Sequence, residues 1–203
     1  MIRRRGLLGA GLLGGIAAAG CSVLPAAQYP QLREWPIVAS RPDPKSARAG
    51  GPVLLVRSVT AAPGLERRGL QTVQRDGSMH VDFYEQWAVP PAEGVEAALR
   101  EWLAGSGLFS AVIGSGSRLS ADLALESELT RFAADPGTGN AEVSLAIALL
   151  DLRRGATRVR LQRTLTADAP LSGSDAPAAA HAILAALADV LGQAVQALAT
   201  ERA

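Results

Sequence analysis

The amino-acid sequence predicts a two-layer α+β domain that follows an N-terminal export segment. Several stretches alternate apolar and polar residues, which is typical of antiparallel strands with one wet face. Two other stretches carry apolar residues at helical spacing. A basic and then apolar leader ends at the only cysteine of the chain, Cys21. We therefore expect a mainly antiparallel sheet of four to five strands, with two helices packed on one of its faces.

The first 20 residues have the three parts of a secretory signal peptide. Arg3-Arg4-Arg5 is a basic start, residues 6–20 are apolar, and the small residues Ala18-Ala19-Gly20 directly precede Cys21. A spanning helix needs about 20 apolar residues, whereas this stretch has 15, six of them glycine. We expect cleavage between Gly20 and Cys21, with a diacylglycerol and an N-acyl chain on the cysteine. Two or more chains anchor a protein stably, whereas one binds only weakly.

The leader leaves the export route open and suggests a destination. Arg4-Arg5 followed by Gly6 resembles a twin-arginine signal, but three arginines equally suit the general secretory route. Ser22 follows the cysteine where an aspartate tends to retain lipoproteins at the inner membrane. We expect a periplasmic protein anchored in the inner leaflet of the outer membrane.

Removal of residues 1–20 leaves 183 residues, enough for one domain with its own core. The loss of three leader arginines leaves 17 basic residues against 19 acidic ones, a net charge near −2. This balance argues against a nucleic-acid partner. Because no second cysteine exists, burial must hold the core without disulfides.

We divide the chain into the signal peptide (1–20), a lipidated N-terminus with a Pro/Gly-rich linker (21–52) and an α+β domain (53–203). The stretch around Tyr29, Leu32 and Trp35 can dock as an extended edge segment. The domain opens with an apolar run at residues 53–56, which indicates a buried strand.

Residues 80–87 alternate clearly and predict the next strand. Phe83 and Trp87 lie on the face that this alternation assigns to the core, and Tyr84 lies on the outer face. Pro90-Pro91 ends the strand.

Helical spacing then predicts two helices. Val95, Leu99 and Trp102 form one stripe of a helix that begins at Pro91 and ends before Gly105. A longer helix begins after Ser174-Asp175 and runs to about residue 200. Its stripe consists of Leu184, Leu187, Leu191, Val195 and Leu198.

Three more alternating stretches lie between the helices, at residues 122–130, 142–149 and 158–165. Residues 151–156 suit a hairpin loop between the last two. Acidic side chains on one strand and basic ones on another can pair across the wet face.

Residues for catalysis are sparse. His80 and His181 are expected on the surface, and Glu126 and Glu128 share one strand face that is expected to be solvated. Ser115-Gly116-Ser117 lacks the strand-to-helix context of a nucleophile elbow. We expect no catalytic residues, no metal and no cofactor, and therefore a protein that is not an enzyme.

The order of several short motifs resembles the ABC-type transport auxiliary lipoprotein (PqiC-like) family, over roughly residues 53–200. The motifs are Leu65-Glu66-Arg67, Arg75-Asp76-Gly77, Trp87-Ala88, residues 107–112 and the stretch from Leu123 to Arg131-Phe132. The family's Tyr-x-Leu strand appears here only as Tyr29-Pro30-Gln31-Leu32. The resemblance implies a non-enzymatic auxiliary of an ABC-type lipid transport system. It implies three partners, namely a subunit with a mammalian-cell-entry (MCE) domain, a permease and an ATPase. A Gly-x-x-x-x-Gly-Lys-Ser/Thr loop is absent, so ATP hydrolysis is not expected of this chain.

We hypothesise that Arg67, Arg68, Arg75 and Tyr84 contact the partner subunit, because arginines and tyrosine are favoured at interfaces. Two alternatives stay open. One is a periplasmic carrier that holds lipid between its helices and its sheet, and the other is an outer-membrane assembly lipoprotein. The sequence leaves the transported substrate and the oligomeric state undetermined.

Overall fold

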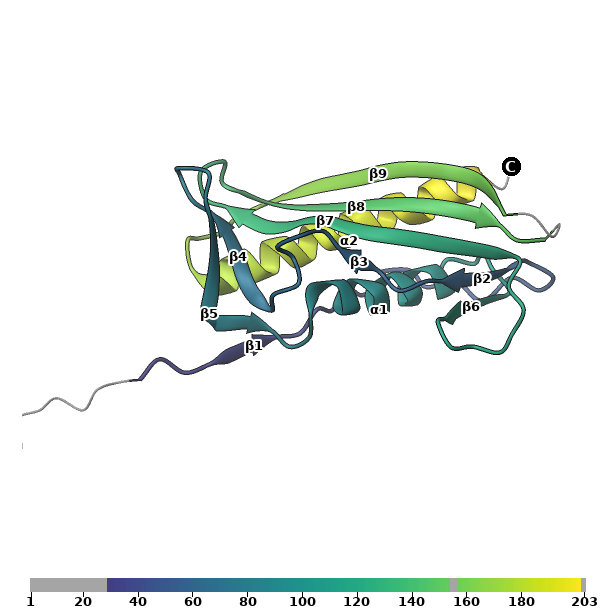
Figure 1. Ribbon diagram of the computed structural model, residues 1–203, viewed down its shortest axis with the longest axis horizontal. Coiled ribbons are helices and arrows are strands. Elements are labelled where there is room, and N and C mark those ends of the chain that lie inside the picture. Colours follow the sequence, from purple (N-terminus) through teal and green to yellow (C-terminus); the bar gives the residue numbers. More distant parts are fainter. Residues whose placement is uncertain (1–28, 154–156, 202–203) are drawn as a thin grey trace, which may run out of the picture. The chain divides into compact units, whose positions relative to one another are not determined.

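The computed structural model describes residues 29–153 and 157–201 (Figure 1). The chain divides into two units, residues 1–31 and 32–203, and every helix and strand described here belongs to the second. The predicted signal peptide, the cleavage site at Gly20 and the lipidation site at Cys21 lie outside the described residues.

Nine strands of the second unit form one mixed sheet, so the prediction of a mainly antiparallel sheet of four to five strands is wrong. Two helices accompany them, as predicted. The strands are β1 (Arg33–Trp35), β2 (Val53–Val56), β3 (Thr60–Ala61), β4 (Gly69–Val73), β5 (Met79–Trp87), β6 (Ala111–Gly114), β7 (Leu123–Asp135), β8 (Asn140–Asp151) and β9 (Arg158–Pro170).

The error has a physical reason. Parallel pairs join β1 to β5, β2 to β6, and β2, β3 and β4 to β7. Five strands have five residues or fewer. Of these the sequence predicts only β2 as a strand and the segment around Trp35, in β1, as an extended edge segment, whereas β3, β4 and β6 are not predicted. Such short runs show little alternation, and alternation reports which face is buried but not the direction of the neighbouring strand.

The three strands predicted from alternation at residues 122–130, 142–149 and 158–165 are confirmed as β7, β8 and β9. β7 pairs antiparallel with β8, and β8 with β9, over almost their full lengths. Their helix-facing side carries fully buried residues such as Leu129 and Leu145, which pair directly. Across the other face Arg131 of β7 pairs with Glu142 of β8 at 3.4 Å, as expected for cross-strand charge pairing.

The helices α1 (Pro91–Ala104) and α2 (Ala176–Thr200) pack on the sheet and on each other (Figure 1). Asp175 caps α2, because its side chain accepts a hydrogen bond from the N–H of Ala178 at 2.9 Å. By length and composition α2 could cross a membrane, but half of its most apolar window is buried inside the protein. Ile183 and Leu191, for example, are fully buried, so α2 serves as a core helix.

Residues 36–52, which the sequence assigns to a linker, lie against α1 and its C-terminal end. The indole N–H of Trp102 donates to the carbonyl of Ala39, and Ile37 occupies the space beside Gly94. The N–H of Lys45 donates to the carbonyl of Gly105 at 2.7 Å. The folded unit therefore begins at Leu32, only eleven residues after Cys21.

Side chains hold β1 against β5. Glu85 accepts hydrogen bonds from Arg33 and from the indole of Trp35, the latter at 2.8 Å. Arg68 donates to Glu34 at 2.7 Å and to the carbonyl of Ala88 at 3.2 Å. These contacts clamp a strand of only three residues, which has few backbone bonds of its own.

A corner interrupts β5 at residues 82–85. The pairing with β4 changes from Gln71 opposite Val81 to Gly69 opposite Gln86. The Asp82 carboxylate accepts the N–H groups of Tyr84 (2.7 Å) and Glu85 (3.0 Å), which folds the backbone into a turn. The prediction of a core position for Phe83 is therefore wrong, because the corner turns it outward and leaves it 72% exposed, whereas Trp87 is fully buried as predicted.

We predict that Gly69→Ala destabilises the protein by about 1–3 kcal/mol, as overpacking does in a tightly packed site. A Cβ at residue 69 would collide with the backbone carbonyl oxygen of Asp82. The matched control is Gly192→Ala inside α2, where the nearest atom is 3.8 Å away. The control should gain about 0.5–1 kcal/mol from helix propensity. The free energy of unfolding of each variant is measured in urea and compared with that of the unaltered chain. If Gly69→Ala were as stable as Gly192→Ala, the close approach of Asp82 to Gly69 would be contradicted.

We also predict that Arg68→Ala loosens β1 while the rest of the fold persists. The N–H of Ala88 donates to the carbonyl of Trp35, and its hydrogen exchange should accelerate by roughly tenfold once the clamp is lost. Arg67→Ala is the control, because Arg67 takes part in none of the ion pairs found among the described residues. Unchanged exchange in the Arg68 variant would show that backbone pairing alone holds β1.

Candidate functional site

The residues considered for catalysis do not converge. His80 is exposed on β5, while His181 on α2 packs edge-on against Trp35 with ring centroids 6.1 Å apart. Ser115 and Ser117 lie in the exposed turn after β6. Within residues 29–153 and 157–201, no group of three His, Cys, Asp or Glu side chains could hold a metal ion.

The wet face of the sheet carries a broad open groove along β7, β8 and β9, with a volume of about 590 Å³. Ala146 and Ala148 line it with small side chains. Arg57 and Glu126 form an ion pair of 2.7 Å at the border of the groove. Glu126, one of the two carboxylates considered for catalysis, is therefore already paired with a cation. Glu128 lines the same groove and is exposed. The lining of the groove therefore mixes polar and apolar side chains.

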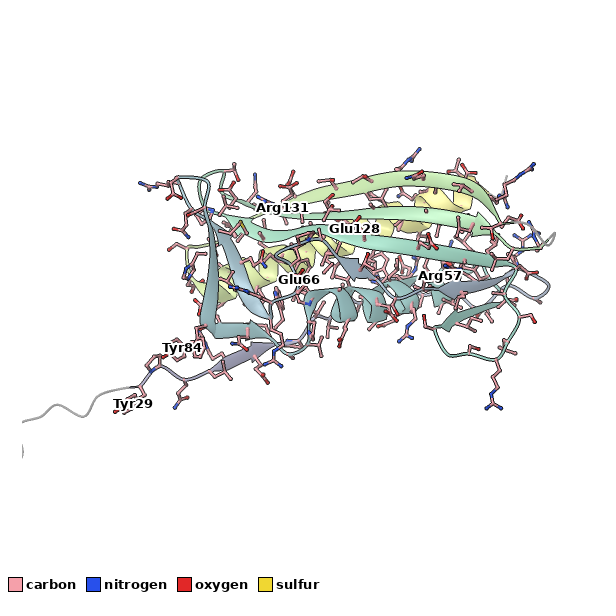
Figure 2. The ribbon with its side chains drawn as sticks, viewed as in Figure 1. Tyr29, Arg57, Glu66, Tyr84, Glu128 and Arg131 are labelled. Carbon is pink, nitrogen blue, oxygen red and sulfur yellow. The ribbon has the colours of Figure 1, made fainter. Side chains whose placement is uncertain are left out.

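A second cavity of about 540 Å³ lies between the loop at residues 63–67, the β4–β5 hairpin and β7. Buried Gln71 fixes this loop by donating to the carbonyl of Gly64 at 2.6 Å. Arg67 and Arg131 both line the cavity, and Figure 2 shows Arg131 and Glu66 towards the β4 end of the wet face. Arg131 is paired with Glu142, which leaves Arg67 as the more available cation.

The four residues predicted to bind a partner lie in different surroundings. Arg67 lines the second cavity, and Arg68 is engaged in the β1 clamp. Arg75 is exposed in the turn that joins β4 to β5. Tyr84 lies at the β5 corner and packs edge-on against Phe83, with ring centroids 5.1 Å apart. Their contact with a partner stays a prediction.

The turn that carries Arg75 is well ordered by its own side chains. Asp76 accepts hydrogen bonds from the N–H and the hydroxyl of Ser78, at 2.9 and 2.7 Å. These bonds stabilise the carboxylate and lower the pKa of Asp76. Gly77 has a φ of 82° and completes the turn. Arg75 therefore projects from a defined hairpin end.

Sequence reasoning missed the β5 corner and the clamp at β1. The corner had a local signal, since an aspartate two residues before Tyr84 can accept backbone N–H groups in a turn. The clamp had none, because Arg68 and its partner Glu34 are 34 residues apart. The clamp engages Arg68, and the corner exposes Tyr84, so these two features decide how available each of the two predicted contact residues is to a partner.

Comparison with known proteins extends these observations. A search of functionally curated proteins finds no match. Among solved structures, the chain is similar to protein XCC0632 from Xanthomonas campestris, with 25% identity and a TM-score of 0.63, over 82% of this chain and 90% of that one.

Two other solved structures share the fold. An uncharacterised protein has 17% identity and a TM-score of 0.59, over 79% of this chain and 95% of its own. The hypothetical protein CT253 from Chlamydia trachomatis has 10% identity and a TM-score of 0.53, over 73% of this chain and 98% of its own. At these identities the likeness shows the fold alone.

The family comparison covers most of the chain. The model of the ABC-type transport auxiliary lipoprotein component family matches residues 34–199, which runs from β1 to the last turn of α2. The match begins inside the segment that the sequence assigns to a linker and includes the strand that the clamp holds. This chain belongs to the ABC-type transport auxiliary lipoprotein component family.

Proposed function

We propose that the chain is a non-enzymatic, lipid-anchored periplasmic component of an ABC-type, MCE-like lipid transport system. In this role it docks or tethers the transporter's periplasmic subunit at the membrane. The family match over residues 34–199 carries the proposal. The partners are the MCE-domain subunit, the permease and the ATPase of the same system.

The anchor of this proposal is Cys21, with its diacylglycerol and N-acyl chains, in the inner leaflet of the outer membrane. Because the folded unit begins at Leu32, eleven residues separate it from the lipid. An extended chain of that length spans at most about 40 Å. The tether is therefore short, and it keeps the folded unit close to the membrane surface.

Two exposed arginines are the best candidates for the partner contact. Arg67 borders the second cavity, and Arg75 projects from the β4–β5 turn. Neither takes part in the ion pairs found among the described residues, so each guanidinium can bind a carboxylate of another protein. Arg68 is already committed to Glu34 and Ala88. The partner surface that fits them is acidic.

The carrier alternative gains no support from the packing between α2 and the sheet. Leu187 and Leu191 of α2 are fully buried, as is Leu145 of β8, and they belong to one apolar cluster. The two larger cavities described above instead have polar side chains at their borders. Mass spectrometry of lipids extracted from the purified folded unit distinguishes the carrier from the docking protein.

We predict that Arg67→Glu combined with Arg75→Glu weakens co-purification with the MCE-domain subunit by about tenfold or more, since reversed charges repel an acidic surface. Arg68 is left unchanged so that β1 stays clamped. The matched control is Arg118→Glu, an exposed arginine in the connection between β6 and β7. Undiminished binding, or an equal loss in the control, would contradict the proposed contact.

We predict that Cys21→Ala leaves a folded but unanchored protein and abolishes its contribution to transport. The core belongs to residues 32–203, so the loss of lipid should not change the unfolding midpoint. Fractionation measures the release from the membrane, and a lipid-transport assay in cells measures the function. If transport continued unchanged with a released protein, the tether would not be part of the function.

A further inference from the structure

The β5 corner presents an aromatic pair to solvent. Phe83 is 72% exposed and Tyr84 is 42% exposed, and the two rings pack edge to face. Aromatic side chains contribute most when they are buried, so an exposed pair indicates a contact surface. Trp87, further along the same strand, is fully buried, so among the phenyl, phenol and indole rings of this strand only the two at the corner are exposed.

The outward position of the pair is built into the backbone. The carboxylate of Asp82 holds the turn, and the amide of Gln86 donates to the carbonyl of Phe83 at 2.8 Å. Gly69 admits the carbonyl of Asp82 at a distance that no side chain allows. The two rings therefore cannot turn inward without breaking these contacts.

The corner lies where the chain enters the folded unit. β1 runs parallel to β5, and the pairing starts with Arg33 opposite Glu85, the residue that directly follows Tyr84. Leu32 directly precedes Arg33 in the chain. Leu32 is itself 54% exposed. Figure 2 shows Tyr84 at the bend of β5, beside the start of β1. The exposed residues Leu32, Phe83 and Tyr84 thus all precede the first pair of β1 and β5, where the chain enters the folded unit.

The acidic groups of the corner are engaged by neighbouring groups. Asp82 accepts two backbone N–H groups through Oδ1, and Glu85 binds Arg33 and the indole of Trp35. These contacts lower the cost of bringing the two carboxylates near lipid headgroups. Phenyl and phenol rings favour the boundary between headgroups and acyl chains, since they combine apolar area with a polar edge.

We propose that Phe83 and Tyr84 insert into the interface of the same membrane that holds the lipid on Cys21. The inference rests on the proposed anchor, because the eleven residues from Cys21 to Gln31 keep Leu32, at the start of the folded unit, within about 40 Å of the lipid. Two attachments, a lipid and an aromatic corner, then orient the folded unit as well as holding it. The occupant of the corner is lipid, so this inference replaces the predicted partner contact of Tyr84 and leaves that contact to the exposed arginines.

The test uses the lipidated full-length chain on vesicles of phosphatidylethanolamine and phosphatidylglycerol, without any partner. A polarity-sensitive fluorophore is attached to Phe83→Cys, or to Leu119→Cys as a control that is 63% exposed in the connection between β6 and β7. A nitroxide quencher on the lipid tails should reduce the emission at residue 83 several-fold more than at residue 119. Hydroxyl-radical oxidation of Phe83 and Tyr84 in the unaltered chain should likewise fall several-fold on vesicles, relative to the soluble Cys21→Ser chain.

Equal quenching at the two positions together with unchanged oxidation of the native rings would overturn the proposal. Protection of the rings that appears only after the MCE-domain subunit is added would also overturn it and would assign the corner to a protein contact. Intact-mass measurement of the acylated protein tests the anchor separately. An acylated protein with an unprotected corner contradicts only this inference, whereas an unacylated mature protein contradicts the proposed function.

Discussion

The second unit depends on the pairing of β7. One edge of this strand pairs with β8 over its whole length, and the other edge is shared in turn by β2, β3 and β4. Strands of two to five residues are not stable alone and need a long neighbour to supply hydrogen bonds. Buried Leu125, Leu129 and Phe132 fasten β7 to the helices.

The sequence predicts this architecture only where a pattern is long enough to repeat. Alternation identifies β7, β8 and β9 because each buries one face over many residues, and helical spacing identifies α1 through Val95 and Leu99. β3 has two residues and therefore no period. The parallel direction of β2 beside β7 depends on the long connection between them, which leaves no local pattern. Phe83 was misplaced because alternation assumes a continuous pleat, which Asp82 interrupts.

The candidate site shows the same limit at the level of single side chains. Residue type identifies arginines that are suitable for an interface, but only the fold tells which of them are already bound. Arg68 follows Arg67 in the chain, yet it reaches across to Glu34 while Arg67 lines a cavity. Two neighbours of the same type thus have separate tasks, one that stabilises the fold and one that is available to a partner.

In the proposed anchoring, the clamp links the chain from Cys21 to the corner. A pull on the proposed lipid would pass through Leu32 into β1, and β1 is held by Glu85, which directly follows Phe83 and Tyr84 in the chain. β1 and the corner are therefore joined by side-chain contacts. An anchor on Cys21 would limit the distance from the membrane to the folded unit more tightly than a linker of 30 residues would, because the folded unit begins at Leu32. For a protein whose proposed task is to hold a partner at the membrane, this constraint on position is itself the function.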